Sequence, residues 1–299
     1  MTFMSTTGQA PVPQAGPPGT LEPLRMTPGR WVVLAVGVPV ALALIGWTGF
    51  SLITTVARGS YPFSYAIPVQ DGHVAVNINA GDVTLREAPG NSTAQLTGTV
   101  QYGLIRPGIS ESITPTGANI GMSCDGISTD CGMSANLDVP ARAAVTLWSN
   151  GGNITASGFS SGMTLWAGGG DVNATNLAGD LQLDTGGGNL TANGLTGNLQ
   201  LATEGGDVDA SGVASGVVGM NSGGGDVTLT FTQVPQNLQI TAEGGNVTVL
   251  LPPGSTKYDI STPDTAGGNV SYPSSLFNPK SPHVITIDSG GGDISVSQG

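Results

Sequence analysis

The sequence predicts an all-β fold, a β-solenoid preceded by one transmembrane α-helix. Three features support this prediction: Gly pairs and triplets recur at regular intervals, apolar residues keep fixed positions around them, and one long uncharged apolar segment lies near the N-terminus. A single repeat of this length cannot bury its own apolar face, so neighbouring repeats must stack. We expect about eight to nine coils of roughly 18–24 residues each, in a right-handed or single-sheeted β-helix-like stack.

The N-terminal part is expected to anchor the chain in a membrane. Residues 1–30 are rich in Pro and Gly, which favours a disordered tail. Residues 31–56 carry no charge. As a helix they would extend about 39 Å, enough to cross a hydrocarbon core of about 30 Å. Residues 57–70 are interpreted as a linker.

The charges beside this segment predict its orientation. Arg25 and Arg30 precede it and Arg58 follows it, which favours a cytoplasmic N-terminus and an extracytoplasmic C-terminal domain. The alternative is a signal peptide cleaved near Ala57, although the apolar core of such a peptide is usually only about 7–15 residues long. We therefore predict a single-pass protein of the cell membrane.

Composition limits the possible partners. The chain has 299 residues, 48 of them Gly, and a formal net charge of -12, most of it carried beyond residue 59. Nucleic-acid binding depends on Lys and Arg that neutralise phosphates, so we expect no nucleic-acid partner. The acidity is interpreted as a means of keeping a Gly-rich domain soluble.

The regular repeats occupy residues 143–299, and each is marked by an Asp or Asn directly after a Gly pair or triplet. The spacings between these positions are 18, 18, 18, 19, 20, 23 and 24 residues, and a degenerate earlier copy lies at Asp82. We name these positions the Asp/Asn column: Asn153, Asp171, Asn189, Asp207, Asp226, Asn246, Asn269 and Asp293.

Two short strands flank each of these turns, because apolar residues alternate with polar ones on both sides. Six residues before the column lie Leu147, Leu165, Leu183, Leu201, Met220, Ile240 and Ile287. One residue after it lie Ile154, Val172, Leu190, Val208, Val227, Val247, Val270 and Ile294, and three residues after it a second apolar position ends with Val249, Tyr272 and Val296. In a stack, these ladders become one continuous core.

Residues 71–142 are less regular and are predicted to form an irregular β cap. They contain both cysteines of the chain, Cys124 and Cys131, and no CxxC metal or redox motif. In an exported domain the two are expected to close a small disulfide loop. A free pair of cysteines is the alternative.

The GG-[DN]-V repeats, the segment Leu137-Asp138-Val139-Pro140 before the first regular copy and Val249-Leu250-Leu251-Pro252 late in the chain carry a family resemblance. Over residues 71–299 the chain resembles the bacterial DUF4097 family of β-strand-repeat, adhesin-like proteins. The resemblance implies a bacterial cell-surface location, and it supplies no catalytic residues.

The Asp/Asn column has two interpretations. Asp and Asn tolerate tight turns and bond nearby backbone, so a structural turn role is favoured. Calcium binding is the alternative, but calcium needs several converging carboxylates, and half of this column is Asn. We therefore expect no metal and no cofactor.

Trp148 and Trp166 are the candidate ligand-binding residues. Each follows an inward Leu, so alternation places it on the outer surface, at the same position of successive coils. Exposed neighbouring aromatic residues mark a binding surface, here one suited to a sugar ring of an envelope polymer. A purely structural cross-strand pair is the alternative.

Catalysis is not expected. Asp184, Glu204, Asp207 and Asp209 cluster in neighbouring copies, and a suitably separated carboxylate pair cleaves glycosides, but acids on a repeat surface are usually there for solvation. His73 and His283 form no metal motif.

We predict an adhesin-like binding module for an envelope polymer or a surface protein; the alternatives are a spacer or stress-sensing shield and, third, a polysaccharide-active enzyme. An uncovered solenoid end would also permit self-association.

Overall fold

The computed structural model describes residues 36–45, 47, 58–124 and 131–299, which belong to two compact units, Met1–Leu52 and Ile53–Gly299. In the first unit, residues 36–45 and 47 are helical and exposed. Within the described parts of the chain, no helix combines the length and apolar character needed to cross a membrane. The predicted tail 1–30 and the remaining residues of the predicted transmembrane segment 31–56 lie outside the described residues.

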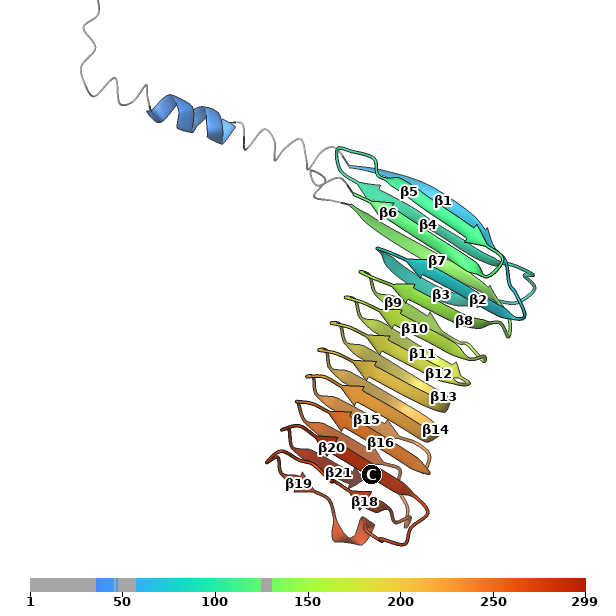
Figure 1. The fold of residues 1–299 in the computed structure, drawn as a ribbon, viewed down its shortest axis with the longest axis vertical. Coiled ribbons are helices and arrows are strands. Elements are labelled where there is room, and N and C mark those ends of the chain that lie inside the picture. The colour runs from blue at the N-terminus through green and yellow to red at the C-terminus, as the bar shows by residue number, and fades with distance from the viewer. Residues whose placement is uncertain (1–35, 46, 48–57, 125–130) are drawn as a thin grey trace, which may run out of the picture. The chain divides into compact units, whose positions relative to one another are not determined.

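The second unit is built almost entirely of strands, which confirms the all-β prediction (Figure 1). The strands form two ladders, and one coil contributes a strand to each. In spatial order the first ladder contains β5 (Gly108–Thr114), β6 (Gly117–Ser123), β2 (His73–Ile78), β8 (Ala144–Ser149), β10 (Met163–Ala167), β12 (Leu181–Thr185), the second halves of β13 (Leu190–Thr203) and β14 (Val208–Ser222), β16 (Asn237–Ala242), β20 (Val284–Ser289) and β18 (Asp259–Ser261).

The second ladder begins at an antiparallel edge. It contains β1 (Gly59–Ile67), β4 (Ala94–Tyr102), β7 (Gly132–Pro140), β3 (Asp82–Ala88), β9 (Ile154–Ser157), β11 (Val172–Ala178), the first halves of β13 and β14, β15 (Val227–Phe231), β17 (Val247–Leu251), β21 (Ile294–Gln298) and β19 (Val270–Ser271). A short 3-10 helix, η2 (Ser274–Leu276), follows β19.

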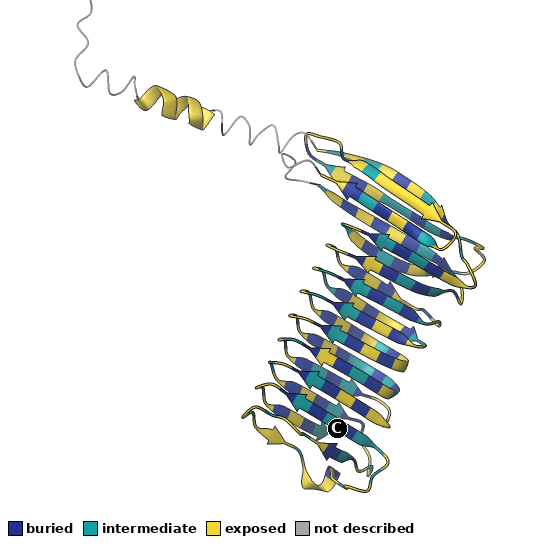
Figure 2. Ribbon diagram, viewed as in Figure 1, coloured by how far each residue is buried: buried dark blue, intermediate teal, exposed yellow. Residues whose placement is uncertain are grey.

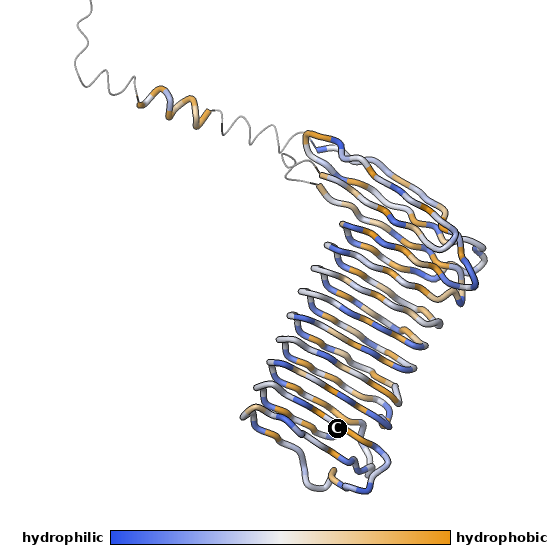
Figure 3. The backbone as a smooth tube through the Cα atoms, in the orientation of Figure 1, coloured by the Kyte–Doolittle hydropathy of each residue, from blue (hydrophilic) through white to orange (hydrophobic). Residues whose placement is uncertain are grey.

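Pairing in the regular part joins equivalent positions of successive coils. Leu165 pairs with Leu183 and Val172 with Leu190, in parallel register. The apolar side chains therefore form continuous ladders, as the alignment of the repeats predicted, and the alternation of buried and exposed residues is visible along each rung (Figure 2). Apolar residues recur along the rungs, with hydrophilic residues between them and at the turns (Figure 3).

The coils do not stack in chain order at the C-terminal end. β20 and β21 pair with β16 and β17, and the earlier strands β18 and β19 pair on their far side. The copy at Asp293 thus lies between the copies at Asn246 and Asn269. The Asp293 copy has an apolar residue at each inward position, whereas the Asn269 copy has few. The Asp293 copy therefore takes the position in which a neighbouring coil covers it on both sides.

Two apolar residues of the Asn269 copy therefore depart from the prediction. Val270 is exposed and Tyr272 is only partly buried, although the alignment placed both in the core. Their coil is the outermost one at this end, so no further coil covers it.

The N-terminal end has the same arrangement. β2 and β3 stack directly on β8 and β9, and the chain between them forms β4 to β7 on the outer side. The degenerate copy at Asp82 is thus a full member of the stack. The edge strands β1 and β5 are linked by Tyr65, whose pKa is raised to about 12 by burial and by its hydrogen bond to Glu111.

The predicted linker at 57–70 is wrong for most of its length. Residues 59–67 form β1, which pairs along its whole length with β4. Phe63 and Ile67 on this strand are buried, so the alternating side chains Tyr61, Phe63 and Tyr65 serve the cap of the stack. Pro62 is tolerated because β1 is an edge strand.

The glycine before each Asp/Asn position is required by the approach of neighbouring coils. A Cβ on Gly188 would collide with the carbonyl oxygen of Gly170, and a Cβ on Gly206 with that of Gly188. We expect Gly188→Ala to lower the free energy of unfolding by about 1–3 kcal/mol, the usual cost of overpacking. Thermal unfolding of the full chain, followed by circular dichroism, measures this.

Gly187→Ala is the matched control for that change. A Cβ at Gly187 meets no atom within 4 Å, so the unfolding midpoint of this variant should stay at that of the unchanged protein. Equal midpoints for the two variants would contradict the steric explanation.

Candidate functional site

The Asp/Asn column forms one continuous hydrogen-bonded ladder along the stack. In each coil the side-chain Oδ1 accepts a hydrogen bond from the backbone N–H of the next column residue, at 2.7–3.0 Å. The spatial order is Asp82, Asn153, Asp171, Asn189, Asp207, Asp226, Asn246, Asp293 and Asn269. These bonds join coils, rather than closing a turn within one coil.

The rearranged order also separates the charges of this column. Because Asp293 lies between Asn246 and Asn269, Asp and Asn alternate along the whole ladder except at Asp207 and Asp226. Within the described ranges, no group of three His, Cys, Asp or Glu side chains is placed to hold a metal ion.

A second column of buried hydroxyl groups supports the same turns. It consists of Ser149, Thr185, Thr203, Ser222 and Ser289. The Thr185 Oγ1 donates to the Gly170 carbonyl of the preceding coil at 2.8 Å and accepts from the Gly188 N–H at 3.1 Å. This column was not predicted, although a Ser or Thr recurs three residues before the glycine that precedes the Asp/Asn position in most copies of the repeat.

Trp148 and Trp166 occupy paired positions on adjacent strands, β8 and β10. Trp148 is 41% exposed and Trp166 is partly buried, so both lie outside the core. The four aromatic ring contacts within the described residues do not include this pair. Trp166 instead packs its ring against Gly168, which follows in its own turn.

The two tryptophans border different hollows. Trp148 borders a small cavity of about 190 Å³ shared with Asn77 and Asn119. Trp166 borders a groove of about 500 Å³ that runs along the carboxyl ends of the strands in the first ladder. The groove is also lined by Asp184, Glu204, Asn221, Thr241 and Glu243, among others, and no Lys or Arg belongs to its lining.

The four carboxylates proposed for catalysis do not share one cavity. Asp184 and Glu204 line the groove, whereas Asp207 belongs to the Asp/Asn ladder. Asp209 lies in the first half of β14, on the other ladder, paired with Thr191 and Thr228. The four residues are close in the sequence, but only Asp184 and Glu204 line the same cavity.

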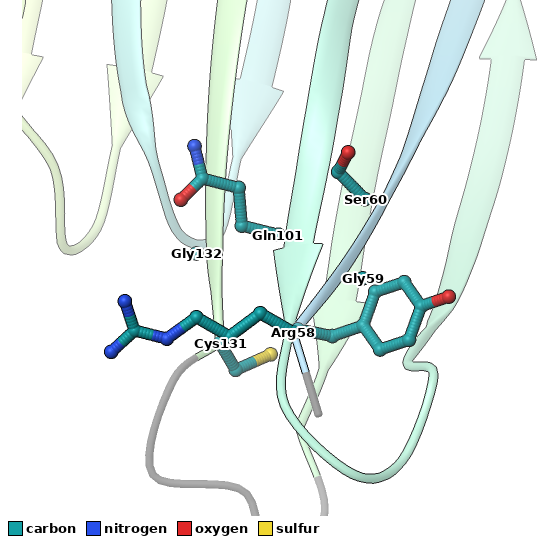
Figure 4. A pocket seen from close by; sticks show the side chains of 7 residues that line it. Arg58, Gly59, Ser60, Gln101, Cys131 and Gly132 are labelled. Carbon is teal, nitrogen blue, oxygen red and sulfur yellow. The ribbon is translucent and has the colours of Figure 1, made fainter. Parts of the chain in front are cut away.

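Another hollow, of about 580 Å³, lies where β1 begins (Figure 4). It is lined by Arg58, Gly59, Ser60, Gln101, Tyr102, Cys131 and Gly132. Cys131 forms a disulfide with Cys124. This hollow was not predicted from the sequence, because it depends on the pairing of β1 with β4, which are distant in the chain.

The Asp/Asn ladder makes a testable electrostatic prediction. Asn189→Asp keeps the acceptor oxygen but places four carboxylates in succession, from Asp171 to Asp226, each neighbouring pair about 5 Å apart and repelling by about 0.8 kcal/mol in water. We expect a lower unfolding midpoint in low salt, and recovery of most of the loss in 0.5 M salt because salt screens the repulsion. Asp207→Asn, which removes the one existing carboxylate contact, should act in the opposite direction.

Asp184 gives a prediction on pH. Burial raises the pKa of this carboxyl, while the hydrogen bond that Gln182 donates to it acts in the other direction. A carboxyl whose pKa is raised on folding costs stability once it is ionised, so Asp184→Asn should stabilise the protein at neutral pH. The gain should vanish at about pH 3, where both folded and unfolded states hold the proton. Unfolding midpoints at the two pH values test this.

Comparison with known proteins gives a family and a few structures. Residues 51–297 match the family model described as Toastrack DUF4097. Matching solved structures include a candidate cell adhesion protein from Clostridium sporogenes (15% identity, TM-score 0.25, covering 81% of this chain and 100% of the other) and a candidate adhesin from Parabacteroides merdae (13%, 0.40, 81% and 96%). A third is a candidate lipid binding protein from Parabacteroides distasonis (12%, 0.35, 80% and 96%). No curated protein sequence matches the chain.

Proposed function

The chain belongs to the Toastrack DUF4097 family, and from this premise we propose that it is a membrane-anchored surface protein whose β-solenoid binds a polyhydroxylated polymer of the cell envelope. The parallel pairing of equivalent positions in successive coils supports the solenoid. The binding surface is the groove beside Trp166, and no catalytic step is assigned to it.

Membrane anchoring is part of the proposal and is supported by the sequence. Residues 31–56 are uncharged and long enough to span a bilayer, and two of the three flanking arginines precede them. In this topology the N-terminus is cytoplasmic and the β-rich unit faces the cell exterior. The disulfide between Cys124 and Cys131 is consistent with an oxidising compartment.

The composition of the groove is the observation that carries the binding proposal. The ring of Trp166 offers an apolar face, and Asp184, Glu204, Asn221 and Glu243 offer carboxylate and amide oxygens next to it. A sugar ring presents an apolar face together with several hydroxyl donors, so it matches both features. An anionic polymer does not, because the lining holds acids and no cation.

The groove also has the form that a linear ligand needs. Its lining residues come from successive rungs of the first ladder, from Trp166 on β10 to Thr241 on β16. Rungs are about 4.8 Å apart, so the groove extends roughly 20 Å along the stack, the length of several sugar units. A polymer lying along the stack would therefore contact several coils at once.

The proposal is tested by binding of the full chain, in detergent, to insoluble cell-wall polysaccharide. Trp166→Ala should weaken retention by about 10-fold or more, because a buried aromatic anchor typically contributes about 1.4 kcal/mol or more. Trp148→Ala is the matched control: it removes the same ring from the adjacent rung but lies outside the groove, so it should leave retention nearly unchanged.

Two outcomes would contradict this assignment. Equal loss of retention in the two variants would place the ligand on the tryptophan pair as a platform rather than in the groove. Failure of the unchanged chain to bind any envelope polysaccharide would remove the binding function and favour the spacer hypothesis.

A further inference from the structure

The loop between β4 and β5, residues 103–107, lies at the point where the chain enters the β-rich unit. Gly59, the first residue of β1, pairs with Tyr102, the last residue of β4. Paired residues of antiparallel strands are about 5 Å apart, so the β4–β5 loop begins beside the first residue of this unit. Gln101 in turn pairs with Gly132, which follows Cys131.

The tip of this loop is apolar and exposed. Leu104 and Ile105 are each 40% exposed. Among the described residues of the β-rich unit, other exposed large hydrophobic residues stand singly in the sequence, whereas these two are adjacent: the single ones are Ile113, Trp148, Val217, Val270 and Phe277. The loop therefore presents a small apolar tip that the fold itself does not cover.

The base of the loop is held in place. Gly103 and Pro107 are buried, and the Tyr61 hydroxyl donates a hydrogen bond to the Pro107 carbonyl at 2.7 Å. The guanidinium of Arg106 lies 3.9 Å from the centre of the Tyr61 ring. Both ends of the loop are thus fixed to β1 and the cap. Leu104 and Ile105 are exposed because these contacts hold the loop in one conformation.

Chain length limits how far this loop is from the proposed membrane segment. That segment ends at Val56, and Gly59 follows three residues later. Fully extended chain covers at most about 3.6 Å per residue, so Gly59 lies within about 11 Å of the end of the segment. The apolar tip next to Gly59 is therefore within reach of the bilayer interface.

We propose that the β4–β5 loop inserts Leu104 and Ile105 into the interface of the bilayer that anchors the chain, with Arg106 among the lipid phosphates. The inference rests on the membrane anchoring in the proposed function. Insertion of the apolar tip provides the attraction. Net charge does not provide it, because the chain carries a formal net charge of -12, most of it beyond residue 59.

The side chains of the loop tip suit the bilayer interface better than they suit the polymer proposed for the groove. At the headgroup boundary, apolar side chains enter the acyl region, while the guanidinium of a neighbouring Arg stays with the phosphates. A hollow lined by Gly59, Gln101 and Tyr102 lies where this loop begins (Figure 4), so headgroups that reach this surface meet the Gln101 amide.

The test uses the full chain reconstituted in vesicles of phosphatidylcholine, with and without phosphatidylglycerol. Ile105→Cys is labelled with an environment-sensitive fluorophore without reductant, so that the native disulfide stays closed. Nitroxide groups on shallow acyl positions should quench this label strongly, and aqueous iodide should quench it at least severalfold less than a label on Val217→Cys. Val217 is the matched control because it is similarly exposed, at 39%, in the middle of the stack.

Flotation of the same vesicles after a carbonate wash separates the two proposals. Protein that floats with the vesicles but whose position-105 label is quenched by iodide like the position-217 label overturns the insertion and leaves the anchoring intact. Protein that does not float overturns both. Quenching by nitroxide lipid in both vesicle types supports apolar insertion; quenching only with phosphatidylglycerol would overturn the statement that net charge does not provide the attraction.

Discussion

The contact on which the array depends is the approach of each turn to the turn before it, at the glycine that precedes the Asp/Asn position. A Cβ at any of these glycines would collide with the carbonyl group of the equivalent glycine one coil away. This close approach also sets the distances for the side chains around it. It places each Oδ1 of the Asp/Asn ladder at hydrogen-bonding distance from the next backbone N–H, and it allows Thr185 to reach the carbonyl of the previous coil. The repeated glycine is therefore required by sterics between coils; of the column glycines in the regular copies from Gly152 to Gly225, none has a positive φ.

Much of the interior could be predicted from the sequence because it obeys a local rule. Alternation within each strand fixes which side chains point inward, and repetition at nearly constant spacing fixes which of them meet. The order of the coils at the two ends does not follow from that rule. It depends on which copy gains more by being covered on both faces, and the complete copy at residues 284–298 gains more than the copy that contains Val270. Pairing of β1 with β4 was missed for a related reason, since it joins segments that are distant in the sequence and lie outside the repeat.

The candidate site shows the same division. The outward direction of Trp148 and Trp166 and their pairing on adjacent rungs follow from alternation and repeat length, and both were predictable. The groove was not, because it depends on which side chain stands at each rung beyond Trp166: Asp184, then Ala202, then Asn221. A small residue between larger polar ones opens space, and the exposed Glu204 and Glu243 in the neighbouring turns border it. Such a hollow depends on the residues that differ from one copy to the next, whereas the repeat pattern describes only the residues that the copies share.

Positions in this fold differ in how much freedom they leave to function. Inward positions must be apolar, the glycine position excludes any side chain, and the Asp/Asn and hydroxyl positions supply bonds between coils. Only the outward positions and the two ends of the stack carry no such duty, so chemistry that serves a ligand has to be placed there. In a regular array, a departure from the repeat at an outward position costs the core nothing, and Trp166 with its acidic neighbours is such a departure. The ends are the other free surface, and the end that receives the chain from the N-terminal segment is the one that presents an apolar loop tip beside Arg106.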